Sequence, residues 1–135
     1  MGAPRAWRWG VDPMSGIETG DVIGGFVVGE KLNTGGMARI HRVIHPELGG
    51  AMVMKSKRLA DGEDPAAIIS FAMEQMILPR LTGPHAPKVF AAGDFTAKPY
   101  IVMGHIQGES LFASLAHLPL SPAMVALLGG KVVQA

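Results

Sequence analysis

The sequence predicts an α+β fold in which one helix packs on a five-stranded antiparallel sheet and two more helices follow. Short β-favouring runs separated by turn residues indicate strands joined by hairpins. One longer stretch between these runs has apolar residues at steps of three and four, the spacing of a helix that packs on a sheet. The composition, 48% hydrophobic and 17% charged over 135 residues, is that of one folded domain of ordinary size.

Hairpins account for the first half of the predicted sheet. Asn33 to Gly36 form a turn between two β-favouring runs, and His45-Pro46 with Gly49-Gly50 separate the second run from the third. Strands joined by such short turns pair antiparallel. Two later runs extend the sheet. The predicted strands are residues 26–32, 37–44, 51–57, 88–95 and 99–103.

The long helix has recognisable signals at both ends. Asp64 is a suitable N-cap, and Pro65 fits the first helical position, where the missing N–H of proline costs nothing. Pro79 and Gly83-Pro84 end this helix. The C-terminal region is predicted to contain a short helical stretch at residues 110–117 and a helix from Ser121 to Ala135.

The net charge and residue composition exclude several classes of protein. The net charge of +1, from 12 basic and 11 acidic residues, gives no support for a nucleic-acid-binding surface. The absence of cysteine excludes a disulfide scaffold and a zinc–thiolate site, and the five histidines lack metal-ligand spacing, so we predict no metal site. No stretch approaches the ~20 apolar residues of a membrane helix, and we expect a cytoplasmic protein without a membrane partner. Residues 1–21 are predicted as a flexible leader, in which Met14 is an alternative start.

Three features could carry chemistry, and each also has a simpler interpretation. Gly35 and Gly36 lie in a predicted hairpin whose amides could approach a phosphate closely, although two such glycines are usually only a turn. Lys55 ends the apolar run Met52-Val53-Met54, and its ammonium could pair with phosphates or extend to solvent. Glu74 lies among apolar neighbours on the long helix. A carboxylate near a half-buried face needs a cation to offset its desolvation, and Lys55 is a suitable partner.

From about residue 23 onward, the order of these features resembles the bacterial (Hanks-type) serine/threonine protein kinase domain. Gly35-Gly36-Met37 resembles part of the kinase glycine-rich loop, and Met52 to Lys55 resembles the Val-Ala-Ile-Lys strand. Glu74 stands where the kinase helix glutamate pairs with that lysine. Pro99 to Met103 resembles the strand that leads into the hinge between the two kinase lobes.

The resemblance implies a nucleotide site and a division of the chain. Residues 22–104 would form the ATP-binding N-terminal lobe, and residues 105–135 the hinge and first helices of an incomplete C-terminal lobe. Lys55 and Glu74 would be the catalytic residues. The implied cofactors are ATP and Mg, with the metal ligands outside this sequence. The implied ATP-binding residues are Leu32, Gly35, Gly36, Ile40, Lys55, Met103, Gly104, His105 and Ile106.

The sequence also departs from the kinase pattern. Asn33 replaces the first loop glycine, Ala38 replaces the third, and Gly104 replaces the glutamate that kinases usually have at the hinge. No His-Arg-Asp-like catalytic loop and no Asp-Phe-Gly occurs. Phosphoryl transfer depends on the groups that those motifs supply, so this chain alone is expected to be inactive.

For an intact protein, the resemblance implies transfer of the ATP γ-phosphate to a serine or threonine of a protein substrate. Two alternatives stay open. The chain could be a non-catalytic nucleotide-binding or interaction fragment, either pseudokinase-like or a truncated gene product. It could also be an unrelated α+β binding domain with Lys55 and Glu74 on its surface. Contact between Lys55 and Glu74 would distinguish the kinase-like fold from the unrelated domain.

Overall fold

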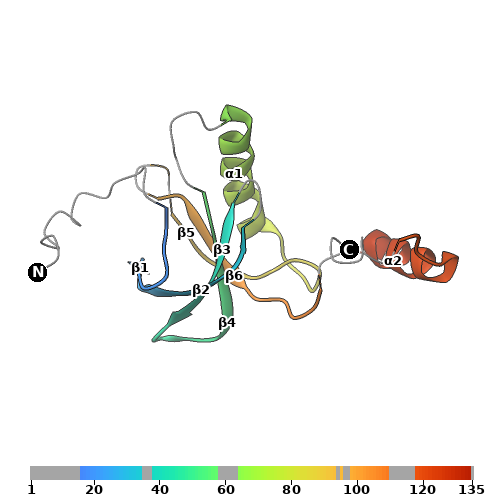
Figure 1. The fold of residues 1–135 in the computed structure, drawn as a ribbon, viewed down its shortest axis with the longest axis horizontal. Helices are drawn as coiled ribbons and strands as arrows, with labels where there is room; N and C mark the ends of the chain where they lie inside the picture. The colour runs from blue at the N-terminus through green and yellow to red at the C-terminus, as the bar shows by residue number, and fades with distance from the viewer. Residues whose placement is uncertain are drawn as a thin grey trace, which may run out of the picture. The chain divides into compact units, whose positions relative to one another are not determined.

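The structure, a computed structural model, describes residues 16–34, 38–57, 64–93, 95, 98–109 and 118–134. The chain divides into two compact units, residues 1–105 and residues 106–135. The first unit contains a single six-stranded sheet with the strand order β1-β2-β3-β4-β6-β5 (Figure 1). The strands are β1 (Val22–Ile23), β2 (Phe26–Thr34), β3 (Arg39–His45), β4 (Leu48–Ser56), β5 (Val89–Gly93) and β6 (Tyr100–Gly104). Every neighbouring pair is antiparallel, as the predicted hairpins required.

The prediction of five strands is wrong by one, because β1 was missed. Val22 pairs with Val27 and Ile23 with Phe26, so this short strand forms a hairpin with β2. Gly24 and Gly25 connect the two strands with φ of 57° and 86°, the positive values that a tight two-residue hairpin turn requires. A strand of two residues is too short to show apolar alternation. The only sequence signal for β1 was therefore the pair of glycines in the turn that follows it.

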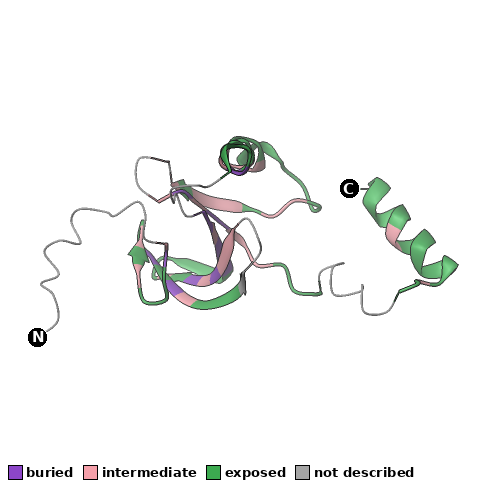
Figure 2. Ribbon diagram, turned by 45° about the horizontal axis from the view of Figure 1, so that its top comes forward, coloured by how far each residue is buried: buried purple, intermediate pink, exposed green. Residues whose placement is uncertain are grey.

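The long helix forms as its end signals predict. α1 (Pro65–Ile77) begins after Asp64, whose Oδ1 accepts a hydrogen bond of 2.9 Å from the amide of Ala66. Pro65 occupies the start of the first turn, and a short 3₁₀ helix, η2 (Leu78–Arg80), follows directly. Figure 2 shows the exposed side of α1 turned away from the sheet.

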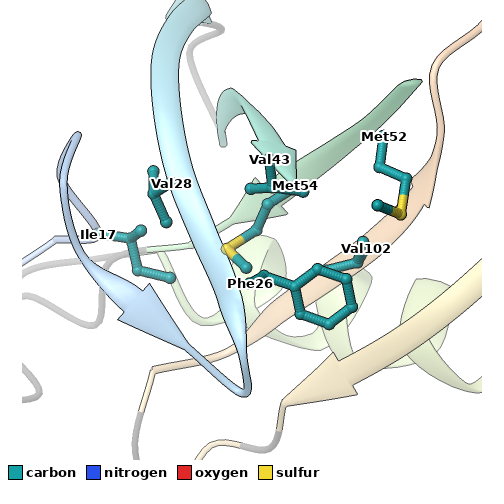
Figure 3. Close-up of a cluster of buried hydrophobic side chains, with 7 residues drawn as sticks. All are labelled: Ile17, Phe26, Val28, Val43, Met52, Met54 and Val102. Atoms are coloured by element: carbon teal, nitrogen blue, oxygen red, sulfur yellow. The ribbon is translucent and has the colours of Figure 1, made fainter. Parts of the chain in front are cut away.

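The main hydrophobic core lies on the face of the sheet opposite α1. Side chains alternate along a strand, so Met54 and Lys55 point to opposite faces of β4. Figure 3 shows core side chains of β2, β3, β4 and β6 gathered inside the curled sheet, together with Ile17. The core residues are Ile17, Phe26, Val28, Val43, Met52, Met54 and Val102.

Ile17 lies within the range predicted as a leader, residues 1–21, but it is only 2% exposed. Three hydrogen bonds join the segment around it to β2. The Val28 amide donates to the Asp21 carbonyl at 2.9 Å. The Gly20 amide donates to the Val28 carbonyl at 2.8 Å, and the Thr19 hydroxyl donates to the Gly29 carbonyl at 2.8 Å. Residues 16–21 are therefore packed on the sheet, and residues 1–15 lie outside the described part of the chain.

His41 is a buried titratable side chain of the sheet. It is 1% exposed on β3, and its Nδ1 has no hydrogen-bond partner among the described residues. Burial lowers the pKa of His41, because it penalises the charged imidazolium. Glu18 and Asp21 oppose this shift in pKa, whereas Lys31 and Arg39 add to it.

The lowered pKa of His41 predicts that stability falls in mild acid. Above pH ~6.5 the imidazole is neutral in both states, and below that pH the unfolded chain binds the proton first, which favours unfolding. Urea unfolding at pH 7.5 and 5.5 should show a smaller acid-induced loss of stability in His41→Leu than in the wild type. His85→Asn, at an exposed histidine, is the control and should behave as the wild type. An equal acid-induced loss in His41→Leu and the wild type would contradict the prediction.

In the second unit the structure describes one helix, α2 (Pro122–Gln134). The Ser121 hydroxyl caps it by accepting a hydrogen bond of 3.2 Å from the amide of Met124, which confirms the predicted start. The other predicted C-terminal helix, residues 110–117, lies outside the described residues. No helix in the described part of the chain is long and apolar enough to cross a membrane.

Candidate functional site

The central feature of the site is an ion pair between β4 and α1. Nζ of Lys55 lies 2.8 Å from both Oε1 and Oε2 of Glu74. The two side chains are 28% and 31% exposed, so water reaches one side of the pair. Hydrogen bonds between charged groups are among the strongest in proteins, and engagement of both carboxylate oxygens fixes the position of the ammonium. The predicted contact between Lys55 and Glu74 is present.

Strand and helix periodicity explain why these two side chains meet. On β4, Val53 and Lys55 share the face that α1 covers, while Met52 and Met54 fill the core on the other side. On α1, Ala67 and Phe71 are buried and Glu74 follows Phe71 by three residues, which places it on the same side of the helix. Glu74 is thus the carboxylate of a helix face that otherwise packs on the sheet.

The residue after Glu74 also faces the sheet. The carboxamide of Gln75 donates hydrogen bonds to the carbonyls of Gly93 and Tyr100. Nearby, the rings of Phe71 and Phe95 meet edge to face with their centroids 6.3 Å apart. No signal in the sequence indicated the hydrogen bonds of Gln75 to the sheet.

Of the two strands that flank the predicted glycine loop, β3 lies beside the lysine of the ion pair. Ile40 of β3 is half-buried and lies directly opposite Lys55 in the β3–β4 register. Leu32 of β2 is 38% exposed. Gly35 and Gly36 lie outside the described residues, so their part in the site stays a prediction. The structure thus brings Ile40 next to the lysine of the ion pair.

Of the predicted hinge residues, Met103 and Gly104 end β6, and His105 and Ile106 follow it. Met103 is half-buried and pairs with Val53 of β4. The Gly104 amide donates to the Lys88 carbonyl at 2.9 Å, and the His105 amide donates to the Ala51 carbonyl at 2.9 Å. These two amides are therefore already used within the first unit.

The side chain of His105 presents a polar atom without a partner. Its Nδ1 is buried and makes no hydrogen bond among the described residues. Ile106 begins the second unit and is 69% exposed. Across the described ranges, no group of three or more histidine, aspartate or glutamate side chains is arranged to hold a metal ion.

The sheet, the packed helix and the lysine–glutamate pair define a kinase-like α+β fold. Among solved structures, the kinase domain of Mycobacterium tuberculosis PknI matches with a TM-score of 0.63 and 24% identity, over 81% of this chain and 45% of that one. A double mutant of the same domain matches with a TM-score of 0.62 and 25% identity, over 78% of this chain and 44% of that one.

The sequence itself is similar to a curated bacterial protein. It is 25% identical over 97 residues to the probable serine/threonine-protein kinase PknB of Bifidobacterium longum (strain NCC 2705). The match covers 65% of this chain and 14% of that protein, and no protein-family model matches the sequence. These comparisons confirm the resemblance to bacterial serine/threonine protein kinase domains, of which this chain spans less than half.

Proposed function

We propose that this chain is the ATP-binding part of a serine/threonine protein kinase. In the intact protein, Lys55 would contact the α- and β-phosphates of ATP while Glu74 holds its ammonium in place. The amides around Gly35 and Gly36 would cover the phosphates. The reaction proposed for the intact protein is transfer of the γ-phosphate to a protein serine or threonine. Mg would be held by ligands outside this sequence and would neutralise charge on the phosphates.

The observation that carries the proposal is the geometry of the Lys55 ammonium. An ammonium group has three N–H donors, and the two contacts of 2.8 Å to Glu74 leave one donor for another acceptor. The side chain is 28% exposed, so that donor is within reach of a ligand from solvent. A fixed, partly exposed cation beside a packed sheet is suited to an anion such as a phosphate.

The hinge residues limit how the adenine could bind. The amides of Gly104 and His105 already donate to carbonyls of the first unit, so they do not serve as donors to an adenine ring nitrogen. The adenine amino group is a donor and would use a carbonyl of this stretch as its acceptor. The unpartnered Nδ1 of His105 adds a polar atom on the same stretch. Such backbone contacts need no side chain at position 104, so the glycine there is compatible with a nucleotide site.

An NMR titration of the 15N-labelled chain with MgATP tests the proposal. We expect the amide signals of Ile40, Lys55 and Met103 to shift with ATP and to stay in place with Mg alone. These three residues lie on adjacent strands, so a ligand at the Lys55 ammonium would change all of their surroundings. An absence of shifts at these residues, or shifts confined to α2, would contradict ATP binding at this site.

A second function is favoured by the departures in the glycine-rich loop. Asn33 and Ala38 stand where kinases have glycine, and their side chains would limit how closely the loop backbone approaches the phosphates. This non-catalytic alternative predicts the same NMR shifts. It differs in predicting no phosphate transfer even from a longer protein that contains this segment.

A further inference from the structure

Gln75 links α1 to the end of the sheet by two directional contacts. Its Nε2 donates to the carbonyl of Gly93 and, at 3.0 Å, to the carbonyl of Tyr100. Gly93 and Tyr100 face each other in the register of β5 and β6. A carboxamide nitrogen has two N–H groups, so one side chain can satisfy one carbonyl from each strand.

Apolar packing alone selects the rotation of α1 only weakly. The helix buries Ala67 and Phe71 against the sheet, but it also carries large apolar side chains on its outer side. A roll of the helix would exchange some apolar contacts for others, because hydrophobic burial has no directional preference. The exposed apolar side chains of α1 are Ile69, Met73, Met76 and Ile77, with exposures of 60%, 53%, 62% and 48%.

Hydrogen bonds are directional and would be lost in such a roll. If α1 rotated, Gln75 would lose its hydrogen bonds to both carbonyls, and part-buried hydrogen bonds are costly to lose. Glu74 directly precedes Gln75 on the helix, so the rotation that satisfies Gln75 also brings Glu74 to Lys55. The hydrogen bonds of the half-buried Gln75 therefore favour one rotation of α1 among those that apolar contacts do not distinguish.

We infer that Gln75 is a positioning residue that selects the rotation of α1 in which Glu74 pairs with Lys55. It does not touch a bound phosphate and acts through Glu74. Its importance for ATP binding rests on the proposed function. The contact that it controls, however, can be measured in this chain without any nucleotide.

Double-mutant cycles for Lys55→Met and Glu74→Gln test the inference. Urea unfolding gives the coupling between the two side chains, first with Gln75 present and then in a Gln75→Leu background. We expect a coupling of about 2- to 5-fold in the folding equilibrium constant with Gln75, which is typical of partly exposed ion pairs. We expect the coupling to vanish with leucine, although leucine is apolar and fills similar space.

Two further variants separate positioning from a general loss of stability. Ser70→Gly weakens α1 at an exposed position without touching either carbonyl, so the coupling should persist. Gln75→Asn keeps a carboxamide but is one methylene too short to reach both carbonyls, and it should lose the coupling even if Gln75→Leu does not fold. Unchanged coupling in a folded Gln75 variant, or no coupling in the wild-type background, would overturn the inference. A failure to bind ATP would contradict the proposed function but would not alter these measurements.

Discussion

Lys55→Met should abolish phosphate transfer in any longer protein that contains this segment together with a catalytic lobe. The substitution removes the ammonium that Glu74 holds at 2.8 Å and with it the proposed contact to the α- and β-phosphates. Loss of one group that stabilises transition-state charge typically lowers kcat by about 100-fold or more. In the present chain, the same substitution should remove the MgATP-dependent shift at Ile40, which is measured by the NMR titration described above.

The fold should survive this substitution. The pair is partly exposed, at 28% and 31%, and pairs of this kind contribute only about 0–1 kcal/mol to the free energy of unfolding. Methionine has a similar length and can keep the apolar stem contacts of lysine. Lys131→Met, on α2, is the matched control, and it should bind MgATP as the wild type does. Wild-type activity or binding in Lys55→Met would show that the lysine has been assigned the wrong role.

The parts of the fold that the sequence predicted well are those with strong periodicity or strong end signals. Asp64 and Pro65 mark the start of α1 because the capping chemistry is local and requires no knowledge of the rest of the chain. The Lys55–Glu74 contact could be predicted for a different reason. A lysine that ends a buried strand and a glutamate on an apolar helix face each need a partner of opposite charge.

The parts that the sequence did not predict depend on distant contacts. Ile17 lies in a stretch rich in glycine and polar residues, and only the curled sheet provides a place to bury it. Gln75 has the same difficulty, since its two acceptors are backbone carbonyls of residues 18 and 25 positions away. Every residue type has a backbone carbonyl, so neither Gly93 nor Tyr100 could be recognised in the sequence as the partner of Gln75.

Met54→Ala should cause the largest loss of stability among the single substitutions considered for this chain. Met54 is 0% exposed and lies at the centre of the core cluster, between strands β3 and β6. Truncation of a buried methionine to alanine costs about 2–5 kcal/mol, because the transfer free energy is lost and a cavity remains. Domains are typically stable by only about 5–15 kcal/mol, so this change removes a large fraction of the total. Urea unfolding measures the difference directly.

Met76→Ala makes the same chemical change on the outer side of α1, where the methionine is 62% exposed. Substitutions at exposed positions usually alter the free energy of unfolding by less than about 0.5 kcal/mol, and alanine also favours the helix slightly. The two variants therefore differ in burial and not in the atoms removed. If Met54→Ala and Met76→Ala changed stability equally, Met54 could not lie in the core. The strand alternation that directs Lys55 towards α1 would then be wrong as well, because both side chains are assigned from the same register of β4.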